Sequence, residues 1–131
     1  MTSAWEAIRG DRRDSPRYRL SLSASVLIYE GIEEGRWPAV LATTSDISRE
    51  GLRLIMPTFG VWYHALQDGT TTLRIMLALP EGHSVDLIGA SSYCHPRRGD
   101  AKRTGYLIGV SLKESEGLAI YRDFIDSLHH S

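Results

Sequence analysis

The 131-residue chain contains a single cysteine, Cys94, which excludes an internal disulfide framework. No apolar run reaches the ~18 residues expected of a membrane span, and residues 1–6 lack the basic-then-apolar order of a signal peptide. The formal net charge is -1, so no strong overall field points to a long polyanion such as DNA. These absences predict a cytoplasmic protein of one domain that neither binds DNA nor spans a membrane.

The sequence also lacks the arrangements that enzymes and metal sites require. It contains neither a P-loop nor a glycine-rich dinucleotide motif, and Ser48 has no nearby histidine in the sequence to act as a base. His95 directly follows Cys94, and this spacing does not suit zinc because adjacent residues of a strand point to opposite faces. We therefore expect a binding protein without metal or cofactor rather than an enzyme.

Hydrophobic alternation predicts a mainly β fold. Residues 20–29 place Leu, Ala, Val and Ile on one side and serines on the other, which is typical of a half-buried strand. Alternation or short apolar runs between turns predict five further strands, at residues 39–44, 52–56, 71–79, 85–94 and 105–112. Residues 115–129 change to helical spacing, with Ser115 as the expected N-cap. This order predicts a six-stranded antiparallel β-barrel closed at one end by a C-terminal α-helix.

Positive charge is concentrated just before the first predicted strand. Residues 9–19 contain five arginines against two acidic residues. The arginines are Arg9, Arg12, Arg13, Arg17 and Arg19. Arginine offers a permanent charge and a planar donor fork that matches phosphate oxygens or a guanine edge. Such a segment buries little apolar area, so we expect it to be mobile without a ligand. The local cluster suits a small anionic ligand.

The sequence contains two short motifs, the first of which lies inside this arginine-rich segment. Arg13 and Arg17 form an R-x-x-x-R pair directly before the first strand. Asp46, Ser48 and Gly51 form a D-x-S-x-x-G motif at the turn expected between the second and third strands. That turn supplies an acceptor, a small hydroxyl and a backbone that a ligand can approach closely. Together the motifs predict one anion-binding site.

In this order the two motifs resemble the signature of the PilZ domain family, and residues 106–112 resemble the family's sixth strand with its glycine. The resemblance covers residues 12–128, so residues 1–11 are expected to be a flexible N-terminal arm and residues 129–131 a tail. It implies a PilZ-like split barrel that binds cyclic di-GMP, a bacterial second messenger, and has no chemistry of its own.

The resemblance also implies a role for each motif residue. Arg13 and Arg17 match the arginines that hold the ligand phosphates and the guanine Hoogsteen edge. Asp46 and Ser48 match the acceptor and the hydroxyl that meet the ligand on the barrel surface, and Gly51 matches the glycine at which the chain turns. The chemistry agrees, because guanine presents N7 and O6 acceptors to arginine, while its N1–H and amine suit a carboxylate.

Arg12 extends the arginine pair by one residue. An arginine at this position resembles the PilZ variants that bind a stacked pair of ligands, whose four phosphate charges suit an additional cation. The resemblance thus implies that Arg12 belongs to the ligand site and that cyclic di-GMP binds as a stacked dimer. We expect ligand binding to order the N-terminal arm and so to regulate a partner protein, which the sequence does not identify.

Two alternatives stay open from the sequence. A PilZ-fold adaptor would interact with proteins without binding nucleotide, and a small barrel can also bind single-stranded nucleic acid. The nucleic-acid alternative predicts aromatic side chains on an exposed strand face, whereas the outward positions of the first strand are mainly serines. Residues 57–68 are expected to form a short helix or an apolar loop over the barrel, and the basic cluster at residues 97–103 a solvated hairpin tip.

Overall fold

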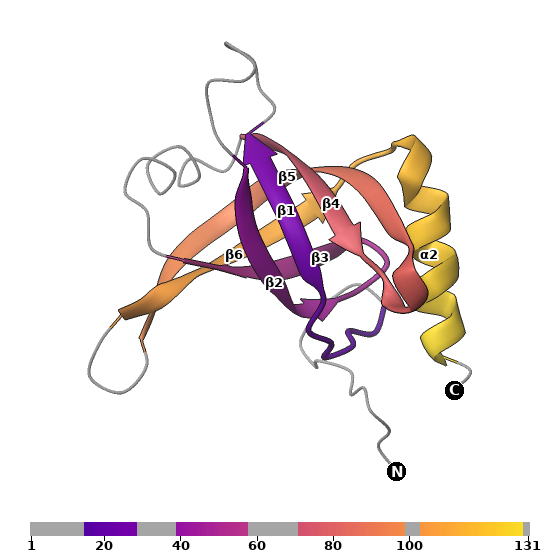
Figure 1. The fold of residues 1–131 in the computed structure, drawn as a ribbon, viewed down its shortest axis with the longest axis horizontal. Helices are drawn as coiled ribbons and strands as arrows, with labels where there is room; N and C mark the ends of the chain where they lie inside the picture. Colours follow the sequence, from indigo (N-terminus) through magenta and orange to yellow (C-terminus); the bar gives the residue numbers. More distant parts are fainter. Residues whose placement is uncertain (1–14, 29–38, 58–70, 99–102, 130–131) are drawn as a thin grey trace.

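The structure, a computed structural model, describes residues 15–28, 39–57, 71–98 and 103–129. Its strands are β1 (Ser23–Ile28), β2 (Val40–Ile47), β3 (Gly51–Met56), β4 (Thr72–Ala78), β5 (Ser84–Arg98) and β6 (Arg103–Leu112). A 3₁₀ turn, η1 (Pro80–Gly82), joins β4 to β5, and the helix α2 (Glu116–His129) follows β6 (Figure 1).

The six strands close into a barrel in the order β1-β2-β3-β6-β5-β4, and each pair of neighbours is antiparallel (Figure 1). This confirms the predicted six-stranded barrel with a C-terminal helix. Two strands run past their predicted ends, since β2 continues to Ile47 and β5 to Arg98. The apolar pattern stops earlier in both strands, but the backbone pairing with the neighbouring strand continues through the polar residues.

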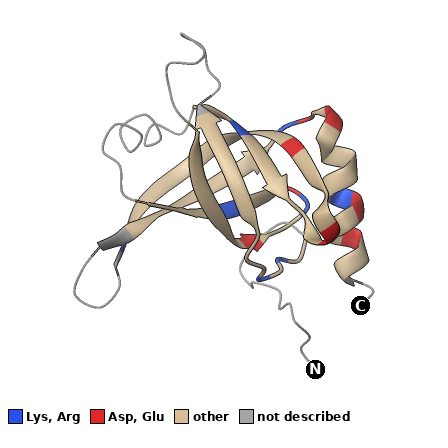
Figure 2. Cartoon of the chain, viewed as in Figure 1, with Lys and Arg blue, Asp and Glu red and all other residues tan. Residues whose placement is uncertain are grey.

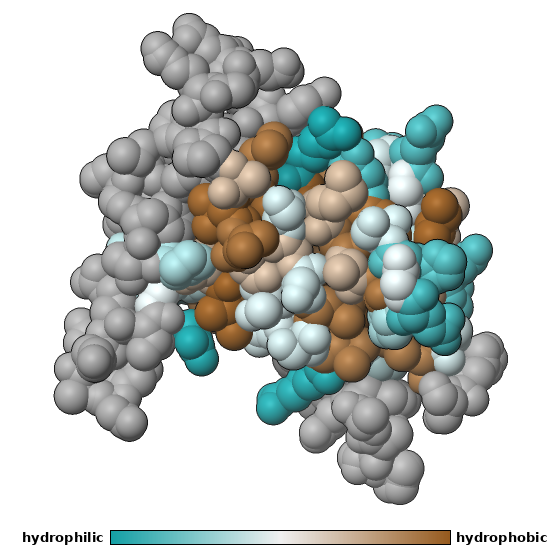
Figure 3. All heavy atoms as spheres, in the orientation of Figure 1, coloured by the Kyte–Doolittle hydropathy of each residue, from teal (hydrophilic) through white to brown (hydrophobic). Residues whose placement is uncertain are grey.

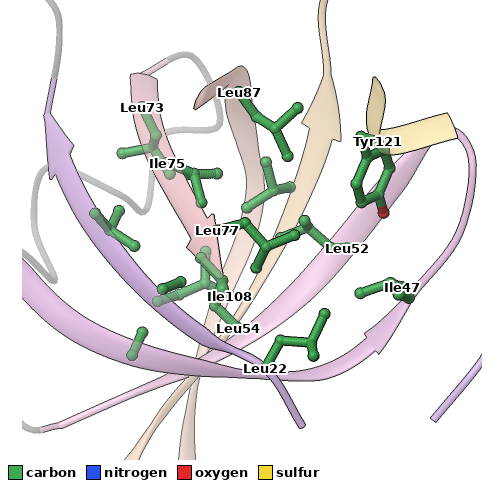
Figure 4. Close-up of a cluster of buried hydrophobic side chains, with 14 of the residues drawn as sticks. Leu22, Ile47, Leu52, Leu54, Leu73, Ile75, Leu77, Leu87, Ile108 and Tyr121 are labelled. Carbon is green, nitrogen blue, oxygen red and sulfur yellow. The ribbon is translucent and has the colours of Figure 1, made fainter. Parts of the chain in front are cut away.

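Alternate side chains of the strands fill the barrel interior (Figure 4). Leu73, Ile75 and Leu77 of β4 are fully buried, as the period of two residues predicted. They pack in one cluster with buried side chains of β3 and β6, including Leu54 and Ile108. Burying one such side chain contributes about 1.5–3 kcal/mol, so the interior is a packed core that holds the surface residues in place.

The helix α2 covers the end of the barrel at which the β2–β3 and β4–β5 connections lie (Figure 1). Its buried residues are Leu118, Tyr121 and Ile125. Gly117 lies so close to β5 that a Cβ there would be 2.2 Å from the carbonyl oxygen of Asp86. Ser115 occupies the expected N-cap position, but its hydroxyl has no hydrogen-bond partner, and the Leu118 N–H donates to the Ser115 backbone carbonyl at 3.2 Å.

The outer face of β1, β2 and β4 carries a mixture of apolar and weakly polar side chains (Figure 3). Leu41 and Met76 are exposed there on either side of Ser25, which pairs with both. An aromatic pair lies instead on β5, where the rings of Tyr93 and His95 stack with centroids 4.9 Å apart. The exposed aromatic side chains of the described strands therefore belong to the β5–β6 region, away from β1.

Candidate functional site

A β-bulge in β2 directs Asp46 away from the barrel interior. Thr44 is buried opposite Leu54, and regular alternation would put Asp46 on the same inner face. The register shifts between Thr44 and Asp46, so Asp46 pairs with Arg53, which lies on the outer face of β3. An extra residue in a strand re-aims the side chain that follows it. Here the bulge brings the carboxylate of the D-x-S-x-x-G motif to the outer face of the barrel, where Arg17 and Arg53 cover it.

Arg17 reaches the same carboxylate from the N-terminal side. The backbone of Tyr18 forms two hydrogen bonds with Ile47, at 2.8 and 2.9 Å, and this bridge holds the chain beside the end of β2. Arg17 Nη1 then donates to Asp46 Oδ1 at 2.8 Å. The two sequence motifs are therefore in direct contact, although 29 positions separate these two residues.

Arg53 is a second cation on Asp46. Its Nε lies 2.9 Å from Oδ2 and 3.2 Å from Oδ1, while the Asp46 side chain is only 5% exposed. Burial lowers the pKa of the Arg53 guanidinium, but the hydrogen bond and charge of Asp46 outweigh burial and leave this pKa raised. Buried charges need charged partners, and Asp46 has two. Its carboxylate thus holds two guanidinium groups side by side at the surface.

Ser48 and Gly51 close the turn between β2 and β3. The Gly51 carbonyl accepts hydrogen bonds from the Ser48 N–H at 2.8 Å and from the Ser48 hydroxyl at 3.2 Å. On the other side, the Tyr121 hydroxyl of α2 donates to the Ser48 carbonyl at 2.7 Å. Burial raises the pKa of Tyr121 well above its usual range, so the phenol stays protonated as a donor. The turn is thus held by its own hydrogen bonds and by the helix.

Gly51 is needed for a close approach between strands. A Cβ at this position would lie 2.4 Å from the carbonyl oxygen of Val110 in β6. The sequence predicted that the chain turns at Gly51, but the structure places it at the start of β3, paired with Ser111 and outside the left-handed φ region. Any side chain here would push β3 away from β6, because the obstructing atom belongs to the backbone.

A pocket of about 220 Å³ opens beside the two arginines. Its polar and aromatic lining comes from Arg17, Glu50, Arg53, Ser92, Tyr93 and Ser111. The Tyr93 ring lies over Gly109, where a Cβ would come within 2.2 Å of the ring. A second hollow, of about 500 Å³, lies on the β2 side of Arg53 and includes Arg19 and Ser45. Arg53 therefore borders both hollows, and the first combines two cations with a flat ring.

Four of the six predicted site residues come together in this region. They are Arg17, Asp46, Ser48 and Gly51. The hydroxyl of Ser48 is directed into the turn and is buried there, whereas the resemblance had implied that it meets the ligand. Arg12 and Arg13 lie outside the described residues, and so do the arm expected at residues 1–11 and residues 58–68.

Sequence reasoning did not identify Arg53, Tyr93 or Glu50 as residues that line the pocket. Arg53 lies opposite Asp46 across the β2–β3 hairpin, and the opposite charges on the two sides of its turn were an available signal. Tyr93 lies opposite Gly109, a relationship that depends on the register of β5 against β6. Glu50 occupies a position inside the D-x-S-x-x-G motif that the motif leaves unspecified.

The charged residues outside this region are distributed over several elements. Acidic residues lie along α2 together with a basic one, and both basic and acidic residues occur on the strands (Figure 2). Among the described residues, no group of three or more His, Cys, Asp or Glu side chains is placed to hold a metal ion. Within the same ranges, no helix is both long and apolar enough for a membrane crossing. Cys94 is buried, which raises the pKa of its thiol to about 11.

Comparison with known families defines the class to which this barrel belongs. The family model described as "PilZ domain" matches residues 11–119, which include both motifs and all six strands. The chain belongs to the PilZ domain family. PilZ domains are binding or adaptor domains rather than enzymes.

A solved structure described as "Structure of Bacillus subtilis Inhibitor of motility (MotI/DgrA)" is similar in fold. Its TM-score is 0.62 at 15% sequence identity, over 92% of this chain and 53% of the other. This chain therefore spans about half the length of that protein, and at this identity the similarity concerns the fold alone. No curated protein matches the sequence.

Proposed function

We propose that this PilZ domain is a receptor for cyclic di-GMP. The observation that carries the proposal is the contact of Arg17 with Asp46, which joins the R-x-x-x-R and D-x-S-x-x-G motifs beside a pocket. The ligand carries two phosphodiester charges and two guanines. Guanidinium groups match both phosphate oxygens and the guanine N7 and O6 acceptors. Arg17 and Arg53 offer two such groups at one surface.

Ligand binding exchanges partners within this group of charges. Arg17 moves from Asp46 to a phosphate or a guanine of the ligand, and Arg53 stays on Asp46. The carboxylate then keeps one charged partner, so it is not left buried and unpaired. Ser48 and Gly51 act through the turn, because their hydrogen bonds fix the backbone next to the pocket.

Regulation of a partner protein follows from the arginine segment. Arg12 and Arg13 precede Arg17 by only a few residues, so a ligand bound beside Arg17 is within their reach. Their charges neutralise the ligand phosphates and draw residues 1–11 against the β2–β3 turn. The surface formed in this way is the one that a partner protein recognises, and the ligand shifts the population toward it.

Calorimetric titration of the whole chain with cyclic di-GMP tests the proposal. We expect saturable binding that cyclic di-AMP does not reproduce at the same concentrations. A folded protein that gives no heat and no shift of its melting temperature with cyclic di-GMP would support the adaptor alternative instead. Binding of a single-stranded oligonucleotide with a steep dependence on salt would support the nucleic-acid alternative.

A further inference from the structure

One carboxylate oxygen in the pocket beside Arg17 has no hydrogen-bond partner. Glu50 lines this pocket, and its Oε1 atom is buried and accepts no hydrogen bond. A buried polar atom that lacks a partner is destabilising, and more so when the group is charged. Such an atom inside a pocket marks a position where a donor from a ligand would be stabilised.

The backbone of Glu50 is fixed, so its side chain has a defined origin. The Glu50 carbonyl accepts a hydrogen bond from the Leu112 N–H at 2.9 Å, at the end of β6. Gly51, the next residue, is held against Val110. The terminal torsion of a glutamate is broad, and its rotation can turn either carboxylate oxygen toward the pocket while the backbone stays in place.

The other carboxylate of the site already has its donors. Both oxygens of Asp46 lie within 3.2 Å of arginine nitrogens from Arg17 or Arg53. Asp46 therefore serves mainly to hold the cations. Glu50 is the carboxylate that can accept new hydrogen bonds.

The chemistry of the pocket favours a base over a metal ion. Two arginine side chains line it together with a single carboxylate, and this charge balance repels a cation. Its volume of about 220 Å³ is below the ≈300–1,000 Å³ of pockets for drug-sized ligands. This suits one purine base rather than the whole dinucleotide. Tyr93 supplies a flat ring on which a base can stack.

We propose that Glu50 reads the Watson–Crick edge of a guanine and makes this site selective for guanine. This inference rests on the proposed cyclic di-GMP function and extends it to the basis of selectivity. Guanine presents two adjacent donors, N1–H and the 2-amino group, which match the two oxygens of one carboxylate. Adenine presents one donor beside the N1 acceptor, and the lone pair of that acceptor would face the carboxylate.

The test compares cyclic di-GMP with its inosine analogue, cyclic di-IMP, which lacks only the 2-amino groups. We expect the wild-type chain to prefer cyclic di-GMP by about 10- to 100-fold, the loss expected for one hydrogen bond to a charged group. Glu50→Ala and Glu50→Gln should each weaken cyclic di-GMP binding and bring the ratio of the two affinities close to one. Glu50→Gln keeps the size of the side chain and so the fold.

Glu114→Gln is the matched control, because Glu114 is exposed and lines a different hollow, near the start of α2. It removes the same charge and should leave the ratio unchanged. Equal strengthening of both ligands by Glu50→Gln would show that Glu50 merely repels phosphate and would overturn the inference. Equal weakening of both would assign Glu50 to another role and also overturn it. A wild-type chain that binds neither ligand would instead remove the proposed function itself.

Discussion

The Tyr121 hydroxyl donates a hydrogen bond of 2.7 Å to the Ser48 carbonyl, across a separation of 73 positions in the chain. Two further contacts join the same parts of the molecule. Arg122 Nε donates to the Arg49 carbonyl at 3.0 Å, and Arg49 forms an ion pair with Asp126. These contacts hold the β2–β3 turn against α2, so a ligand that displaces the turn also displaces the helix.

Tyr121→Phe should reduce the free energy of unfolding by about 1–3 kcal/mol, because it leaves the Ser48 carbonyl buried without this donor. Urea unfolding followed by circular dichroism measures the change. Ser127→Ala is the control on the same helix, since its exposed hydroxyl donates to the Phe124 carbonyl at 2.7 Å, and it should cost less than ~0.5 kcal/mol. An unchanged urea midpoint for Tyr121→Phe would contradict the assignment of this hydrogen bond.

Arg17→Ala and Arg13→Ala should each weaken cyclic di-GMP binding by about 2–5 kcal/mol, the usual loss for one partner of a close charged contact. The fold should persist in Arg17→Ala because Asp46 keeps Arg53 as its partner. Arg74→Ala removes an exposed arginine that pairs with Asp86 and lies on β4, a strand that lines neither hollow beside Arg53, and should leave the affinity unchanged. Titration calorimetry measures these affinities. Wild-type affinity in a folded Arg17→Ala protein would disprove the site assignment.

Gly51→Val should destabilise the fold by about 2 kcal/mol or more, because the side chain would overlap the Val110 carbonyl. Gly82→Ala separates this effect from backbone strain, since Gly82 has a φ of +86° but open space around it. It should cost only about 1 kcal/mol. The two melting temperatures give the comparison, and a Gly51→Val protein as stable as the wild type would rule out the close approach.

Arg12→Leu tests the stacked pair of ligands. If Arg12 holds the second ligand, the wild-type chain binds two cyclic di-GMP molecules and the variant binds one with appreciable affinity. If Arg12 only adds to the general positive charge, the ratio stays fixed and the affinity falls slightly, with a strong dependence on salt. Titrations of both proteins at two salt concentrations measure this. A ratio of one in the wild type would remove the stacked pair and keep the receptor assignment.

The barrel was predictable because its core depends on a periodic pattern. Leu73, Ile75 and Leu77 alternate in the sequence with Arg74 and Met76 and are fully buried in the structure. Because one face of such a strand must be buried, the alternation predicts both the strand and which of its side chains point inward. The helix was predictable for the same reason, since Leu118, Tyr121 and Ile125 recur at helical spacing and enter the core.

Only part of the site could be predicted, because the position of Asp46 depends on a β-bulge that interrupts the alternating pattern. The motifs pointed to Arg17 and Asp46, but the bulge before Asp46 has no sequence signal and decides which face the carboxylate occupies. The role of Arg53 follows from that bulge. Tyr93 and Gly109 meet only because the register of β5 against β6 shifts between Ser91 and Tyr93, the first of two such shifts along this pair.

The closed barrel also limits how another chain can add a strand to this one. A foreign strand needs an edge with open backbone groups, and closure pairs both sides of each strand within the barrel. Among the described strands, β5 beyond its pairing with β4 at Ala90 has only β6 as a neighbour, and the two continue as a ribbon to Arg98 and Arg103 (Figure 1). This ribbon, which carries Tyr93 and His95, therefore offers an open edge to a partner that binds by β-augmentation.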